Sequence, residues 1–371
     1  MERREVRIDR RRRLAEEPST GHNRWHPDIP PAVECDPGDE VILETRDAFD
    51  GQFSPDATID AVRSPNLNLV HPLTGPVFVA GAKPGDLLEI EILEVEPEKY
   101  GFTVQVPGFG FLRDVFPDPF FVKWRIADGW ATSSDLPGVR VQGAPFMGTI
   151  GLAPDRPLLE RTKLREDVTI AAGGFALPPD PADAVPSAEP IASESLRTIP
   201  PRETAGNVDI KQLTAGTHLF VPVFAAGGLF SAGDAHFAQG DGEVCGTAIE
   251  MGATLHVRFT VHDGEAQRRG VRTAEFSREM PAPVPEPRRY YATTGLSLTR
   301  DGQQRAEDLT LAARNAVLNM IDHLTASGPW TPQQAYAICS VAVDLKVSEL
   351  VDVPNFVVSA FLSLDVLGGD A

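Results

Sequence analysis

Cysteine is scarce in this chain of 371 residues. Only Cys35, Cys245 and Cys339 are present, far apart and without a CxxC pair. An odd and scattered set excludes a disulfide framework and argues against a thiolate zinc site. The same pattern is typical of a reducing compartment, so we expect a cytoplasmic protein.

The chain also lacks long apolar runs and an excess of positive charge. No stretch reaches the ~18 consecutive apolar residues that a membrane-spanning helix needs. The basic start, "MERREVRIDRRRR", is not followed by the apolar segment of a signal peptide. A formal net charge of −19 would be repelled by nucleic acid and by anionic membranes, so we expect neither as a partner. We interpret residues 1–20 as a basic arm, either solvated or docked on an acidic neighbouring subunit.

Several catalytic signatures are absent as well. The sequence has no GxSxG elbow, no phosphate-binding P-loop, and no GxGxxG that follows a strand and opens a helix. Serine-nucleophile chemistry therefore has little support.

Glycine and proline are abundant, with 32 and 33 residues, which favours short strands and tight turns. Four segments place a glycine turn before a strand of alternating polarity. They are residues 36–45, 83–92, 214–223 and 250–259, with Gly38, Gly85, Gly216 and Gly252 in the turns. We therefore predict an α+β, mainly β fold, built of sandwich or barrel modules with an internal duplication and C-terminal helices.

The composition divides the chain further. We assign residues 21–175 to a first β-rich module and residues 198–300 to a second. A segment rich in proline, alanine and serine, residues 176–197, joins them as a long loop.

The C-terminal region, residues 301–371, is predicted to be helical. Apolar residues spaced by three and four predict an amphipathic helix over residues 303–327. A second helix is expected over residues 331–344, because Thr331 and Pro332 are typical of a helix start.

The stretch "GDAHFAQGDGE", residues 233–243, is crowded with side chains that bind metals or move protons. Asp234 and His236 are two residues apart, so in a strand they project from the same face, as a pair of metal ligands must. Asp241 and Glu243 repeat this spacing after a glycine. Imidazole and carboxylate ligands suit zinc, or iron or manganese in an oxygen-rich site. The structural alternative is a polar loop whose acidic residues cap turns.

Other candidates lie elsewhere in the chain. His22 lies in "GHNRWHPDIPP" and Asp50 in "RDAFDGQ", and each has a structural alternative as a surface or turn residue. His71 follows an apolar run, where a histidine is often part of the core. Cys245 is a rival nucleophile, but no base is visible beside it, and a buried small hydrophobic residue is the alternative.

Eight sequence blocks resemble the acetamidase/formamidase family, in the order of that family. They are "GHNRWHPDIPP", "DAFDGQ", "HPLTGPVFVAGAKPGDLLEIEI", "GTIGLAP", "TIPPRETAGNVDIKQL", "GDAHFAQGDGE", "CGTAIEM" and "VDVPN". The resemblance implies hydrolysis of a small amide, or ring opening of a cyclic one such as a γ-lactam. It also implies a β-rich fold, a homo-oligomer and, as in some members, a divalent metal near the acidic and histidine cluster. Only Val244 separates the "GDGE" of this chain from its Cys-Gly, a shorter spacing than in some relatives, which puts a role for Cys245 in doubt.

Amide hydrolysis needs an activated water, a stabilised oxyanion and a proton for the leaving nitrogen. A bound ion of the zinc type supplies the first two. We therefore expect Asp234, His236 and the remote His71 to bind a divalent metal, zinc in preference to calcium. Glu243 is the expected base, with Asp241 as a second catalytic carboxylate.

The amide itself needs hydrogen-bonding partners. We expect Gln239 and Asn207 to bind the substrate, with Asp50 and His22 as further candidates. Two other functions stay open at this point. One is a non-catalytic β-sandwich that binds a ligand and holds calcium, in which His236 would not be a ligand. The other is an amidase that forms an acyl-enzyme at Cys245.

Overall fold

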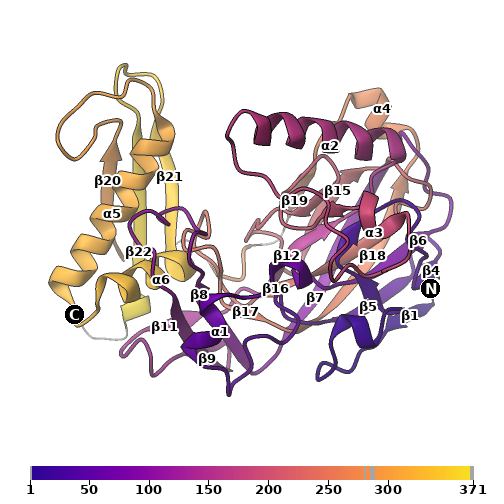
Figure 1. The fold of residues 1–371 in the computed structure, drawn as a ribbon, viewed down its shortest axis with the longest axis horizontal. Coiled ribbons are helices and arrows are strands. Elements are labelled where there is room, and N and C mark those ends of the chain that lie inside the picture. The colour runs from indigo at the N-terminus through magenta and orange to yellow at the C-terminus, as the bar shows by residue number, and fades with distance from the viewer. Residues whose placement is uncertain (1, 280, 285–288, 368–371) are drawn as a thin grey trace.

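The computed structural model describes residues 2–279, 281–284 and 289–367. Two large β-sheets form most of the molecule, and a smaller unit of helices and strands stands at the C-terminal end (Figure 1). In the described residues the strand orders of both large sheets are open. The α+β, mainly β class is therefore confirmed, and of the two expected architectures the closed barrel is excluded.

The first sheet has six strands and contains all four of the predicted turn-and-strand segments. In spatial order it consists of β1 (Arg3–Val6), β5 (Glu40–Thr45), β18 (Ala253–His262), β7 (Leu87–Pro97), β15 (Thr217–Pro222) and β19 (Glu275–Arg278). The expected glycine turns precede β5, β7 and β15, where Gly38, Gly85 and Gly216 have φ of 91°, 95° and 85°. The expectation is wrong at Gly252, because the chain there runs directly from β17 (Glu250–Met251) into β18 without reversing.

The four inner strands of this sheet alternate between the two halves of the chain. β5 and β7 come from the first half, β18 lies between them, and β15 lies beside β7, with every neighbouring pair antiparallel. A twofold axis between β18 and β7 would exchange β7 with β18 and β5 with β15. An internal duplication predicts this arrangement.

The second sheet has eleven strands and carries the polar cluster. Eight strands follow one another in space: β11 (Arg140–Gln142), β10 (Trp130–Thr132), β9 (Phe120–Ala127), β8 (Tyr100–Gln105), β17, β16 (Phe230–His236), β12 (Phe146–Gly151) and β14 (Ala205–Asn207). β6 (Leu73–Val79) also pairs with β16 and brings in β2 (Gly21–His22) and β4 (Val33–Cys35). A separate pair joins β3 (Arg24–Trp25) to β13 (Leu196–Arg197). β16 is buried over its whole length, so its polar side chains lie in the interior.

Two hydrophobic clusters hold the sheets in place. The larger one joins the facing sides of both sheets, and Phe230 of β16 meets Phe259 of β18 edge-on with ring centroids 5.1 Å apart. The second cluster surrounds Phe49, Phe53 and Phe102, whose rings contact one another. This second cluster forms one wall of the cavity described below.

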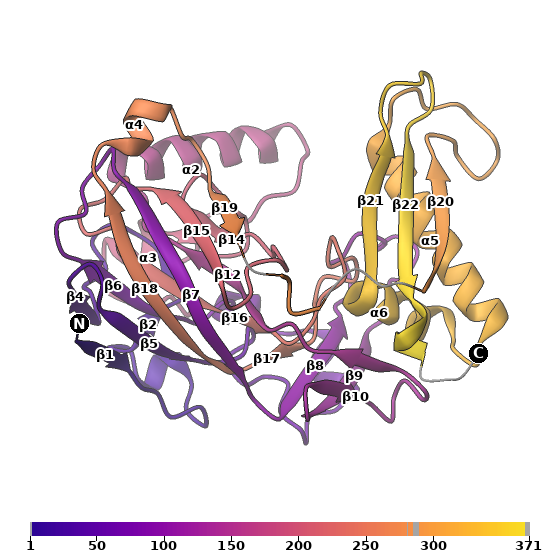
Figure 2. The same cartoon turned by 180° about the vertical axis from the view of Figure 1, so that it is seen from behind.

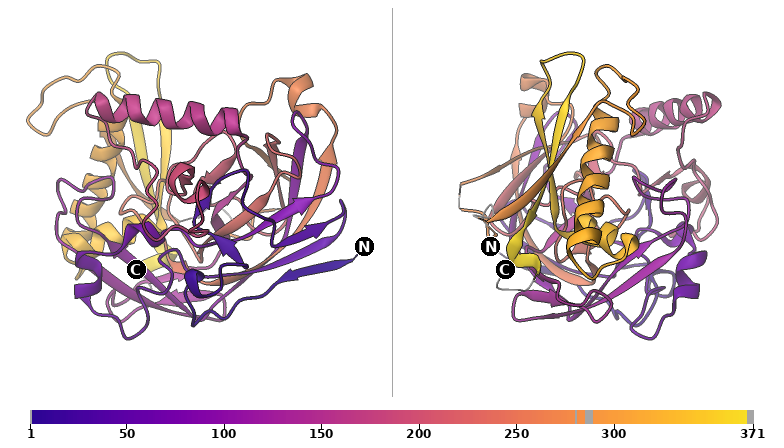
Figure 3. Two further views of the ribbon diagram at one scale, coloured as in Figure 1. Left: turned by 45° about the vertical axis from the view of Figure 1, so that its right-hand side comes forward. Right: turned by 90° about the vertical axis from the view of Figure 1, so that its left-hand side faces the viewer.

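Four helices, three of them short, connect the strands of the main body. They are α1 (Ile59–Arg63), α2 (Arg156–Ala171), α3 (Ile191–Glu194) and α4 (Glu265–Arg269), with 3-10 turns η1 (Leu14–Glu16) and η2 (Leu67–Leu69). The long one, α2, begins where the side chain of Asp155 accepts a hydrogen bond from the backbone of Leu158 at 2.8 Å. It lies across from the C-terminal unit in Figure 1, and both views of Figure 3 show it along the upper edge of the molecule.

The C-terminal unit contains both predicted helices, α5 (Leu309–Ser327) and α6 (Pro332–Ala342). The side chain of Thr331 caps α6 as expected, accepting a hydrogen bond from Gln334 N at 3.3 Å. The region is not purely helical, however. Three strands, β20 (Tyr290–Leu296), β22 (Val357–Ser363) and β21 (Val343–Glu349), form a sheet beside α5, and η3 (Leu364–Leu367) follows (Figure 2). Apolar residues at every second position, Val343, Leu345 and Val347, favour a strand where the helix was expected to end.

The basic arm belongs to the main sheet. β1 pairs in parallel with β5, and Arg3 and Arg7 form ion pairs with Glu40 and Glu44 at 3.2 and 3.0 Å. Its acidic partners thus come from this chain itself. In the part of the chain that the structure describes, no helix is both long enough and apolar enough to cross a membrane.

Candidate active site

Strand β16 brings Asp234 and His236 together in the interior. Both residues are at most 3% exposed, and Oδ1 of Asp234 lies 3.3 Å from Nε2 of His236. The expected proximity of the two side chains is therefore confirmed. Opposite Asp234 on the neighbouring strand β12 lies Gly148, since Met147 and Thr149 pair with the residues on either side.

The orientation of the His236 ring is fixed by Gln239. The amide nitrogen of Gln239 donates to the backbone oxygen of Asp209 at 2.8 Å, which turns its Oε1 towards Nδ1 of His236 at 3.0 Å. Nδ1 must then carry the proton and donate it to Gln239, so Nε2 faces the carboxylates. Such a hydrogen bond to one ring nitrogen is the usual way of preparing the other nitrogen for a metal.

Four carboxyl groups surround this imidazole, of which those of Asp234 and Glu250 are buried and those of Asp209 and Glu243 are partly buried. Besides Asp234, Oε2 of Glu250 lies 3.2 Å and Oε1 of Glu243 lies 3.8 Å from Nε2 of His236. Asp209 is the fourth. Two overlapping groups, Asp234–His236–Glu250 and Asp209–His236–Glu243, each bring three ligand atoms within 4.8 Å of one another. His236 is common to both.

The crowding shifts the ionisation of these side chains. Burial raises the pKa of Asp209 and that of Glu243 well above the ordinary range, and it raises the pKa of Glu250 to about 7. Burial acts the same way on Asp234, but His71 and His236 outweigh it and hold the pKa of Asp234 low. Carboxyl groups so close together and so little exposed to water cannot all be negatively charged without compensation. Bound protons or a bound cation must offset their charge.

The donor set fits a divalent metal ion. Oδ1 of Asp209 and Oε2 of Glu250 are buried without any hydrogen-bond partner. A Cβ at position 148 would lie 2.6 Å from Oδ1 of Asp209 and 2.8 Å from Oδ2 of Asp234, so glycine keeps this space open. Unpaired carboxylate oxygens beside an oriented imidazole are the ligands that zinc and related ions prefer.

Two further predicted residues lie beside this cluster. His71 points Nε2 at Oδ2 of Asp234, 3.8 Å away, and burial lowers the pKa of this histidine. The hydroxyl of Thr149 lies 3.1 Å from the same Asp234 oxygen and 2.6 Å from Oδ1 of Asn207. Nδ2 of Asn207 donates to the backbone oxygen of Ile199 at 3.1 Å, so this amide is held rigidly.

Three predicted residues are not brought to the cluster. Asp241 turns away to Lys211, whose Nζ lies 3.3 Å from its Oδ1. Asp50 accepts a hydrogen bond from the backbone of Leu14 at 3.0 Å and so anchors the basic arm. His22 lies 2.8 Å from the hydroxyl of Ser231, and burial lowers the pKa of its imidazole to about 4.

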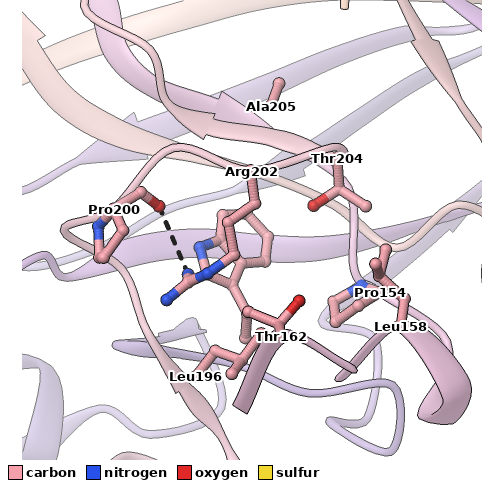
Figure 4. Close-up of a pocket in the computed structure, with 9 residues that line it drawn as sticks. Pro154, Leu158, Thr162, Leu196, Pro200, Arg202, Thr204 and Ala205 are labelled. Atoms are coloured by element: carbon pink, nitrogen blue, oxygen red, sulfur yellow. Dashed lines mark hydrogen bonds between the residues drawn. The ribbon is translucent and has the colours of Figure 1, made fainter. Parts of the chain in front are cut away.

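A cavity of about 600 Å³ opens on the cluster. Its polar lining consists of nine residues, namely His71, Arg113, Asn207, Asp209, Asp234, Gln239, Glu243, Thr247 and Glu250. Asp50, His22 and Asp241 do not line it. Figure 4 shows a different cavity, under α2, where Arg202 donates to the backbone oxygen of Pro200. That space is about 10 Å³, enough for roughly one water.

Sequence reasoning missed Asp209, Glu250, Thr149 and Gly148. Each lies inside a block that carried the family resemblance, and Asp209 stands two residues after the candidate Asn207. That spacing is the same signal that identified Asp234 and His236. Glu250 offered no such signal, because only the pairing of β17 with β16 places it beside His236.

Cys245 is not exposed to the cavity. It is 1% exposed, its thiol lies 3.7 Å from the backbone oxygen of Val104, and burial raises its pKa to about 11. A nucleophilic cysteine needs a depressed pKa and a base, and this thiol has neither.

We therefore expect the Cys245→Ala variant to fold and to keep more than about a tenth of its activity, a loss under ~1.4 kcal/mol in barrier height. The measurement is kcat of the folded variant with an amide substrate. Complete loss of activity, together with a covalent acyl adduct on the wild-type protein detected by mass spectrometry, would establish the cysteine mechanism instead.

Comparison with known proteins places this geometry in a family. The family model described as "Acetamidase/Formamidase family" matches residues 7–368. A formamidase of Methylophilus methylotrophus is 35% identical, covering 98% of this chain and 94% of that protein. An acetamidase of Mycolicibacterium smegmatis is 36% identical, covering 89% and 87%. A solved structure, "gamma lactamase from Delftia acidovorans", is 35% identical with a TM-score of 0.92, covering 98% of this chain and 93% of that one.

The buried cluster, its cavity and these relatives agree on one chemistry. The chain belongs to the acetamidase/formamidase family and is an amidohydrolase that acts on carbon–nitrogen bonds other than peptide bonds.

Proposed function

We propose that this protein hydrolyses a small linear or cyclic amide with a water molecule activated at the buried cluster around His236, in the presence of a bound divalent metal ion. The observation that carries the proposal is the convergence of four carboxyl groups, two buried and two partly buried, on one oriented imidazole at a cavity.

The chain offers its own residues for each task. Asp234, His236 and Glu250 would hold the ion, with His71 next to Asp234. When bound, such an ion lowers the pKa of water and polarises the amide carbonyl. Zinc is favoured over calcium because His236 is common to both candidate groups, and calcium prefers an all-oxygen shell.

Glu243 is the proposed proton carrier. Its Oε1 lies 3.8 Å from Nε2 of His236 and its side chain lines the cavity, and burial raises its pKa, so it is a stronger base than an exposed glutamate. It takes a proton from the attacking water as the new C–O bond forms. It then gives this proton to the leaving nitrogen as the C–N bond breaks. The second water proton passes from the new carboxylic acid to the released ammonia, so the products are a carboxylate and ammonium, or a single amino acid from a lactam.

Asn207 is the proposed partner of the amide. One N–H and the carbonyl oxygen of its side chain are already engaged, which leaves the second N–H for the substrate. Gln239 acts through His236 by fixing its ring, since both of its polar ends bind protein atoms. Asp241, Asp50 and His22 have no place in this scheme because they bind elsewhere.

The relative named as a γ-lactamase supports cyclic amides, and those named formamidase and acetamidase support linear ones. A cytoplasmic location and a homo-oligomer stay predictions from the sequence. Buried free thiols at all three cysteines agree with a reducing compartment.

The first test is a substrate and metal assay on the purified protein. We expect ammonia release from a linear amide, or ring opening of a γ-lactam followed by NMR, and close to one zinc ion per chain by elemental analysis. If the protein contains only calcium and hydrolyses no amide, the proposed enzyme function is wrong and a binding protein that holds calcium is the better description.

A further inference from the structure

The cavity is far larger than the smallest amides need. Acetamide has four non-hydrogen atoms, and the volume of about 600 Å³ corresponds to roughly 20 water-sized groups at ~30 Å³ each. A site built for acetamide alone would leave most of this space to water.

Most of the remaining side chains in the lining are apolar, with Arg113 and Thr247 as the polar exceptions, and seven of the apolar ones belong to one body. Ala48, Phe49, Val70 and Val106 are buried members of the second hydrophobic cluster, and Leu67, Phe109 and Ile199 pack against that cluster. The cavity therefore lies between two different surfaces. One is the polar cluster of the eleven-stranded sheet, and the other is a face of a hydrophobic core.

The apolar wall is held in place from behind. The ring of Phe49 contacts those of Phe53 and Phe102 with centroids 4.7 and 6.0 Å apart. Phe109 is pressed against Gly246, where a Cβ would come within 2.6 Å of the ring. Gly246 follows Glu243 by only three residues in the same loop, so Phe109 borders the place where the amide would react.

A fixed apolar wall beside a reactive polar group recognises a molecule with both characters. Resting on the proposed amide hydrolysis, we propose that the preferred substrates are neutral amides whose acyl part is an apolar chain or ring of roughly five to ten carbons. Phe109 is the residue that sets this preference, because it links the apolar wall to the loop of Glu243.

The test is a series of primary amides with the wild-type protein: acetamide, butyramide, hexanamide and cyclohexanecarboxamide. Burial of each methylene is expected to raise kcat/KM about fourfold, so hexanamide should exceed acetamide by roughly a hundredfold or more. Ammonia release is measured for every member, and the inference is read from the ratio between members.

The Phe109→Ala variant should lower this hexanamide-to-acetamide ratio at least about tenfold, because the longer acyl chain loses its contact with the ring and acetamide is too short to make that contact. Phe276→Ala is the matched control, because Phe276 is a 45% exposed phenylalanine on β19 that does not line the cavity. It should leave the ratio unchanged. A variant that folds poorly would lower all rates together, and the wild-type series still decides the substrate class.

A flat wild-type series, or one in which acetamide is fastest, would overturn the apolar-substrate inference and leave amide hydrolysis standing. An unchanged ratio in Phe109→Ala would overturn the role of Phe109. If no amide of any size is hydrolysed, the proposed function itself fails, and the inference with it.

Discussion

Replacing His236 with alanine is expected to remove both the bound metal and amide hydrolysis. Its Nε2 belongs to both groups of possible ligands, and Gln239 holds the ring for that purpose. Without it, Asp234 and Glu250 face each other across the space that the ring occupied, with His71 as the remaining histidine beside them. We expect activity to fall by at least about 10⁴-fold, since the ion supplies much of the transition-state stabilisation.

The measurements are metal content per chain and turnover of an amide, on protein whose fold is checked by thermal unfolding. His26→Ala is the matched control, because this imidazole is also 1% exposed but does not line the cavity. It should keep its metal and most of its activity. His236→Ala with wild-type metal content and normal turnover would show that the cluster is structural and that the active site lies elsewhere.

The Glu243→Gln variant is expected to behave differently, keeping its metal but losing about 10²–10⁴-fold in kcat. Glutamine has the shape of glutamate and cannot accept the proton of the attacking water. The proposed metal-holding residues Asp234, His236 and Glu250 are untouched by this change.

The control for Glu243→Gln is Asp241→Asn, which removes a carboxylate two residues away in the same loop. Asp241 pairs with Lys211 and does not line the cavity, so this variant should retain activity within about tenfold of wild type. If Asp241→Asn loses more activity than Glu243→Gln, the proton carrier has been assigned to the wrong carboxylate.

Much of the fold was predictable from local signals. The alternation of apolar and polar residues after Gly38, Gly85 and Gly216 identified three strands. The turns before them were recognisable because a positive φ favours glycine, and glycine is visible in the sequence. The cap at Thr331 identified α6 for the same local reason. The order in which β18 enters between β5 and β7 depends on pairings between distant segments, and no local pattern encodes it.

The residues of the candidate site were also predictable only where the contact is local in the sequence. Asp234 and His236 share one strand, so their spacing sufficed to predict that they meet. Glu243 and Asp241 share the spacing too, yet only Glu243 reaches the cluster, because Lys211 from another segment pairs with Asp241. Asp209 reaches His236 only through the folded sheet. Spacing predicts contacts within one strand or turn, and partners from elsewhere need the tertiary structure.

The alternating strands of the six-stranded sheet affect how the chain can fold during synthesis. β5 and β7 leave the ribosome early, but β18, which must lie between them, follows on the order of 150 residues later, or roughly 8 to 30 s at the usual rates of translation. Throughout that time both strands keep unpaired edges, which invite pairing with other chains. The N-terminal half therefore cannot complete its sheet alone, and a chain stopped before residue 253 would be a substrate for chaperones and proteases rather than a folded fragment.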